Sequence, residues 1–119
     1  MTEFLAAKAN MIEMLKYSKL EFAEYKKHGN KIHLQEAGEK LFNAFSRYLE
    51  IRYKRVTGDH GEIWNLANLD KNNSTILSQL DILHSYFYHG ESYRVKAEQI
   101  EPIFKNVVDK VESRIKNLR

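Results

Sequence analysis

The feature of this sequence that most constrains its fold is the scarcity of residues that interrupt a helix. The 119 residues include one proline and five glycines, whereas a β-rich chain needs frequent turn residues. The helical spacing of apolar residues breaks at Gly29, Gly58, Gly61 and Gly90, and once more at Asn72-Asn73. Between the breaks, apolar side chains recur every three or four residues, as on the buried face of an amphipathic helix. The sequence therefore predicts an all-α fold with five helices.

The expected helices cover roughly residues 2–27 and 31–56, a short segment after Asp59, and residues 74–89 and 96–118. The first two are long and separated by a short break, so they should form an antiparallel hairpin near 35 Å long, at about 1.5 Å per residue. We expect the whole chain, 1–119, to fold as a single up-and-down bundle with that hairpin at its N-terminus. The apolar residues expected to face inward are Phe4, Met11, Leu15, Phe22, Tyr25, Leu34, Ala37, Leu41, Ala44, Phe45, Tyr48, Leu49, Ile63, Trp64, Ala67, Ile76, Leu80, Leu83, Phe87, Ile100, Ile103, Phe104, Val107, Val111, Ile115 and Leu118.

Two helix starts carry recognisable cap patterns. Asp59 followed three residues later by Glu62 is the pattern of a capping box, in which each residue bonds the backbone N–H of the other. Asn73 or Ser74 is the expected cap of the fourth helix.

The composition excludes several classes of function. Hydrophobic residues make up 43% and charged residues 29% of the chain, which is typical of a soluble globular protein. There is no cysteine, so disulfides and thiolate metal sites are excluded, and the five histidines lack the spacing of metal ligands. We therefore expect no metal and no cofactor. No apolar run approaches the ~20 residues needed to span a bilayer, and the N-terminus does not read as a signal peptide. We expect a cytoplasmic protein that does not contact a membrane.

A basic and aromatic segment, residues 52–64, carries the main candidate site. Arg52, Tyr53, Lys54 and Arg55 fall on the expected last turns of the second helix, and Trp64 follows after a glycine-rich turn. These cations could attract a phosphate, while Tyr53 or Trp64 could stack on a base. The alternative is that the cations are solvated and favoured there by the helix dipole.

A second aromatic cluster surrounds the end of the fourth helix. Phe87 belongs to the expected core, but one helix face cannot bury all of its aromatic neighbours. We expect the remaining residues to line a cleft or a dimer seam: His84, Tyr86, Tyr88, His89 and Tyr93.

Three segments together resemble the HEPN superfamily (higher eukaryotes and prokaryotes nucleotide-binding), in particular an archaeal-type branch. Residues 34–44 are similar to its Ala-x-Glu-Lys helix. Residues 59–66, which read Asp-His-Gly-Glu-Ile-Trp-Asn-Leu, are similar to its His-x-Leu-x-x-Leu helix start. Residues 83–90, which read Leu-His-Ser-Tyr-Phe-Tyr-His-Gly, are similar to its Leu-His-x-x-Phe-Tyr stretch.

The resemblance implies a helical bundle that forms a homodimer through its long helices and acts with a nucleotidyltransferase or an antitoxin partner. The active ribonucleases of the superfamily carry an Arg-x(4–6)-His motif, and Arg55 and His60 match its positions. In such an enzyme Arg55 would hold the phosphate and His60 would move a proton. This chain departs from the active pattern at Val56, where a polar residue is usual, and at Gly58, which interrupts the helix.

Three functional hypotheses follow. The first is a HEPN-like homodimer that binds nucleotide, RNA or a nucleotide-handling protein. The second is a metal-independent endoribonuclease of toxin type that uses Arg55 and His60. The third is a structural interaction domain without a ligand.

Overall fold

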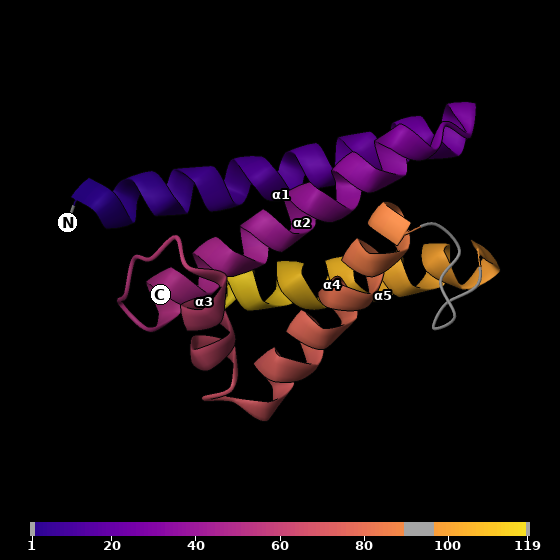
Figure 1. Cartoon of the computed structure of the whole chain (residues 1–119). Helices are drawn as coiled ribbons and strands as arrows, with labels where there is room; N and C mark the ends of the chain where they lie inside the picture. Colours follow the sequence, from indigo (N-terminus) through magenta and orange to yellow (C-terminus); the bar gives the residue numbers. More distant parts are fainter. Residues whose placement is uncertain (1, 90–96, 119) are drawn as a thin grey trace.

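The computed structural model describes the backbone of residues 2–89 and 97–118 and, within these ranges, all side chains except those of residues 2, 3, 31, 84–89 and 97–99. In this part of the chain it contains five α-helices and no strand, which confirms the predicted all-α bundle (Figure 1). The helices are α1 (Thr2–His28), α2 (Lys31–Arg52), α3 (His60–Ala67), α4 (Lys71–His89) and α5 (Ala97–Lys116).

The predicted N-terminal hairpin is present, and α1 and α2 pack closely against each other (Figure 1). Gly29 ends α1 with a φ of +69°, a left-handed conformation that glycine adopts without a steric penalty. Its N–H donates to the Tyr25 carbonyl oxygen at 2.7 Å. Asn30 then caps α2, because its side-chain oxygen accepts from the Ile32 N–H at 3.0 Å. The chain thus reverses direction within two residues.

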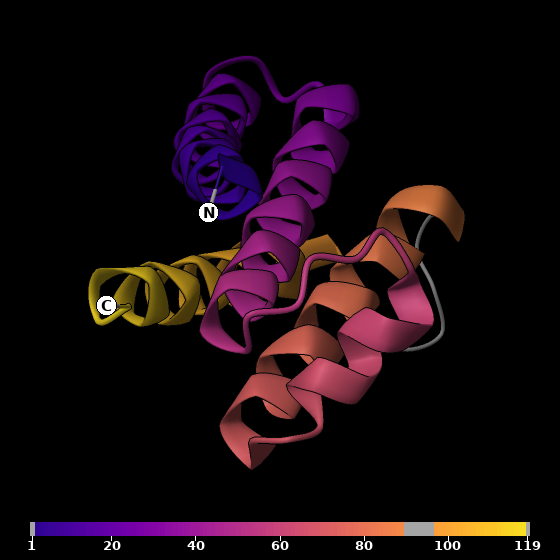
Figure 2. The ribbon, with the colours of Figure 1, turned by 90° about the vertical axis from the view of Figure 1, so that its left-hand side faces the viewer.

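Helix α2 lies at the centre of the bundle and contacts each of the other four helices. Figure 2 shows it between α1 on one side and α3 and α4 on the other. Because α2 has neighbours on several sides, its apolar side chains are covered by the other helices. All seven predicted core residues of α2 are buried: Leu34, Ala37, Leu41, Ala44, Phe45, Tyr48 and Leu49.

Helix α5 closes the bundle against α1 as well as α2. The rings of Phe22 and Phe104 stack with their centroids 4.3 Å apart. Two ion pairs flank this contact, one between Lys19 and Glu112 and the other between Lys26 and Glu101. The ring contact buries apolar surface, whereas such exposed pairs contribute little to stability.

Helix α2 ends at Arg52, so the predicted end at residue 56 is wrong. The backbone of Lys54 has a φ of 54°, which does not continue a right-handed helix. The buried Glu50 carboxylate accepts the Thr57 N–H at 2.6 Å, and the Glu50 carbonyl oxygen accepts the Arg55 N–H at 2.9 Å. Because Glu50 binds these two amides, residues 53–59 fold back over the end of α2 as a loop.

The starts of the next two helices also differ from expectation. Helix α4 begins at Lys71 rather than near residue 74, because Asp70 supplies the cap and its side-chain oxygen accepts from the Asn72 N–H at 2.8 Å. Asp59 caps α3 as predicted, through a 2.7 Å bond from the Gly61 N–H. The reciprocal half of the predicted capping box is not formed, because Glu62 binds Arg55 instead.

Candidate anion-binding site

The basic segment lies where the loop after α2 meets the C-terminal end of α5. Arg52, the last residue of α2, and Lys54, in the loop, both line a pocket of about 410 Å³ between these elements. We call it the α2–α5 pocket. Its lining residues are Tyr48, Ile51, Arg52, Lys54, Arg114, Asn117 and Leu118.

Arg114 is the cation of this pocket that sequence analysis missed. It lies in the last turn of α5, distant in sequence from the basic segment, and no motif surrounds it. Only the packing of α5 against α2 brings it to Arg52. Its position near a helix C-terminus, where cations are favoured, was the one available signal, and it is an unspecific one.

The three cations of the pocket have no carboxylate partner among the described residues. Arg52 instead sits over the ring of Tyr53, with its guanidinium carbon 5.2 Å from the ring centroid. The described residues that line the pocket include no acid. Arg52, Lys54 and Arg114 therefore form a site of positive charge that an anion would neutralise.

A buried polar cluster lies next to this pocket. Burial raises the pKa of the Tyr48 hydroxyl, while the charges of Arg114 and Arg52 act in the opposite direction. Asn73, which is 1% exposed, donates through Nδ2 to the Tyr53 hydroxyl at 3.4 Å. The Tyr53 side chain is partly buried and packs against the core. The bond from Asn73 positions the Tyr53 hydroxyl beside the cations.

Arg55 and His60 occupy different surroundings. The Arg55 guanidinium donates to both carboxylate oxygens of Glu62, from Nη2 at 2.9 Å and from Nε at 3.3 Å. These bonds raise the pKa of Arg55 and, together with a bond from Thr57, lower that of Glu62. His60 is exposed at the start of α3, with its ring centroid 5.4 Å from that of Phe42. Neither Arg55 nor His60 lines the α2–α5 pocket.

The remaining candidates are placed only in part. Trp64 is partly buried and packs against the hydrophobic core, so only part of its ring is open to a ligand. His84, Tyr86, Tyr88 and His89 belong to the backbone of α4, but their side chains lie outside the described residues, as does the whole of Tyr93.

The described residues contain no group of three or more His, Asp or Glu side chains arranged to hold a metal ion. Over the same residues, none of the helices combines the length and the apolar character needed to cross a membrane.

Comparison with known proteins gives no relative on which to base a function. No family model, no curated protein and no solved structure matches this chain.

Proposed function

We propose that this chain is a HEPN-like domain that binds a phosphate-bearing ligand, a nucleotide or RNA, in the α2–α5 pocket. The observation that supports this most directly is the convergence of Arg52, Lys54 and Arg114 on one pocket whose described lining includes no carboxylate. Like charges in one pocket repel each other, and a bound phosphate would relieve that repulsion. Two of the three are arginines, whose planar guanidinium matches phosphate oxygens two at a time.

The other lining residues suit a nucleotide better than a bare anion. Tyr48, Ile51 and Leu118 give the pocket an aromatic and aliphatic wall, and Asn117 adds an amide. A volume of about 410 Å³ lies within the usual range for small-ligand sites. A phosphate held by the cations would leave the sugar or base against this wall.

Binding without cleavage is the function that the geometry supports better. Arg55 must exchange Glu62 for a phosphate before it could act on RNA, because its guanidinium already donates two bonds to that carboxylate. Among the described residues, the cations of the α2–α5 pocket have no such competitor.

The test compares the RNA affinity of two variants that lose one positive charge each. Arg114→Gln removes a pocket cation, whereas Lys27→Gln removes an exposed one in the last turn of α1, at the other end of the hairpin from the pocket (Figure 1). Fluorescence anisotropy with a labelled single-stranded RNA should show about tenfold weaker binding for Arg114→Gln, as for the loss of one charge-assisted hydrogen bond. Lys27→Gln should bind like the wild type within about twofold. Equal affinities for all three proteins, or no binding by the wild type, would refute the proposed site.

The same samples also test the ribonuclease alternative. We expect the RNA to stay intact during incubation with EDTA. RNA cleavage that continues in EDTA and disappears in His60→Ala would instead indicate a ribonuclease that uses Arg55 and His60.

We also propose that the chain forms a homodimer through α1. Leu5, Ile12 and Leu20 are half or more exposed and lie on one side of this helix. Leu5 and Leu20 stand at nearly equal spacing on either side of Ile12, so two antiparallel copies of α1 would place leucine against leucine. Light scattering should then give twice the 14.1 kDa mass of one chain. A mass of one chain at high concentration would exclude the dimer.

A further inference from the structure

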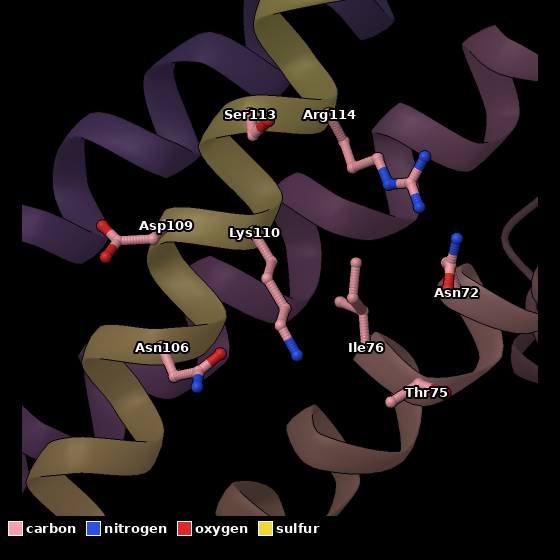
Figure 3. A pocket seen from close by; sticks show the side chains of 8 residues that line it. All are labelled: Asn72, Thr75, Ile76, Asn106, Asp109, Lys110, Ser113 and Arg114. Carbon is pink, nitrogen blue, oxygen red and sulfur yellow. The ribbon is translucent and has the colours of Figure 1, made fainter.

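A second pocket lies beside the first, between the first turns of α4 and the C-terminal half of α5. We call it the α4–α5 pocket, and its volume is about 560 Å³. Figure 3 shows the Lys110 and Arg114 side chains extending from α5 toward α4, with the Asn72 amide opposite Arg114. The lining residues are Asn72, Thr75, Ile76, Asn106, Asp109, Lys110, Ser113 and Arg114.

In the described part of the chain, the Lys110 and Arg114 side chains of this pocket have no close counter-ion. The nearest partner of the Lys110 ammonium is the neutral Gln79 side-chain oxygen, at 3.5 Å. Asp109 is the single acid among the described lining residues, and its carboxylate points away from α4 and from Lys110 (Figure 3). The pocket therefore presents two cations and several amide and hydroxyl groups, which together suit a phosphate.

Arg114 lines both pockets, so they adjoin at its side chain. The polar lining residues of α5 recur at helical spacing and therefore lie on one face of the helix. From Asn106 to Asn117 this face is about 16 Å long, at 1.5 Å rise per residue. Stacked nucleotides rise by about 3.4 Å each along a strand, so the face is longer than one nucleotide.

We propose that Arg114 joins the two pockets into one track along α5 that binds several linked phosphates, as in single-stranded RNA, and not a mononucleotide alone. Lys110 contacts a different phosphate from the one held by Arg52 and Lys54. This inference rests on the proposed function, because it takes the α2–α5 pocket as one end of the track. The track adds a second phosphate subsite and requires a ligand longer than one nucleotide, and the α2–α5 pocket alone implies neither.

The experiment compares AMP with a single-stranded oligoadenylate on the same variants. Lys110→Gln should leave AMP affinity unchanged within about twofold, weaken the oligonucleotide about fivefold and lower its salt slope by about one. Arg52→Gln should weaken both ligands. Lys27→Gln serves as the control for the loss of one surface charge, and circular dichroism checks that each variant is folded.

The outcomes separate this inference from the proposed function. If Lys110→Gln binds the oligonucleotide as the wild type does while Arg52→Gln weakens AMP, the track is wrong and the α2–α5 pocket remains. If Lys110→Gln weakens AMP as much as the oligonucleotide, there is one site and no second subsite. If the wild type binds neither ligand, both proposals fail.

Discussion

The buried carboxylate of Glu50 makes a sharp prediction about the loop that carries Lys54. Glu50 is 1% exposed, and one of its oxygens accepts the Thr57 N–H at 2.6 Å. Its other oxygen lies against Arg47 Nε, in the geometry of an ion pair and not of an aligned hydrogen bond. Glu50→Gln keeps the shape of the side chain but leaves one oxygen where there were two. Either the Thr57 N–H or the Arg47 Nε–H then faces the NH₂ group of the new side chain, which cannot accept a hydrogen bond.

The magnitude follows from these two contacts. A hydrogen bond to a charged acceptor contributes about 1.5–3 kcal/mol and a neutral one about 1 kcal/mol, so the Thr57 contact loses about 1 kcal/mol. Arg47 also loses the negative charge of its ion-pair partner, which costs a further ~1–2 kcal/mol. We therefore expect Glu50→Gln to lower the free energy of unfolding by about 2–3 kcal/mol, which for a domain of this size lowers Tm by roughly 10 °C.

The assay is urea unfolding followed by circular dichroism and by the fluorescence of Trp64, with hydrogen exchange at the Thr57 amide. Glu36→Gln is the matched control, because Glu36 is also in α2 but is 46% exposed and 3.7 Å from Lys40. Its unfolding free energy should change by no more than about 0.5 kcal/mol. If Glu50→Gln is as stable as Glu36→Gln, or if the Thr57 amide exchanges equally slowly in both, Glu50 does not hold this loop.

Two further predictions concern the turn between α1 and α2 and the response to acid. Gly29→Ala should cost about 1 kcal/mol, because the φ of +69° is strained for alanine although no atom lies within 4 Å of the added Cβ. Gly58→Ala, equally uncrowded and without a positive φ, should be neutral or slightly stabilising in the same urea titration; equal costs would disprove the backbone argument. Partner cations lower the pKa values of Glu101 and Glu112 below the ordinary 4.5. The folded state then binds fewer protons than the unfolded state, so this stability is present above pH 4.5 and is lost as the pH falls below it. The urea midpoint of Glu101→Gln/Glu112→Gln should fall less than that of the wild type between about pH 6 and pH 3, and parallel curves would exclude these pairs as a cause.

Much of the fold was predictable because its signals are local. The apolar spacing in α2 identified all seven of its buried apolar residues, and the break at Gly29 marked the turn of the hairpin. Asp59 was recognisable as a cap because capping involves residues only two or three positions apart.

The errors occur where a side chain forms contacts beyond its own helix. The apolar spacing of α2 continues past Arg52, but the Glu50 carboxylate accepts the Thr57 N–H and the helix ends at Arg52. Glu62 fitted a capping box by spacing, yet Arg55 from the loop competed for its carboxylate. Each outcome depends on how a loop folds back, which local preference does not specify.

The sequence alone determined that this chain is a bundle of amphipathic helices, since each helix is encoded by residues within a few positions of one another. It also determined that Arg52 and Lys54 lie together. Only the tertiary structure decided that Arg114 joins them and that Lys110 lines an adjoining pocket. The physical reason is that the grouping of charges from distant helices depends on the packing of α5 against α2 and α4, and the spacing of residues along one helix carries no information about it.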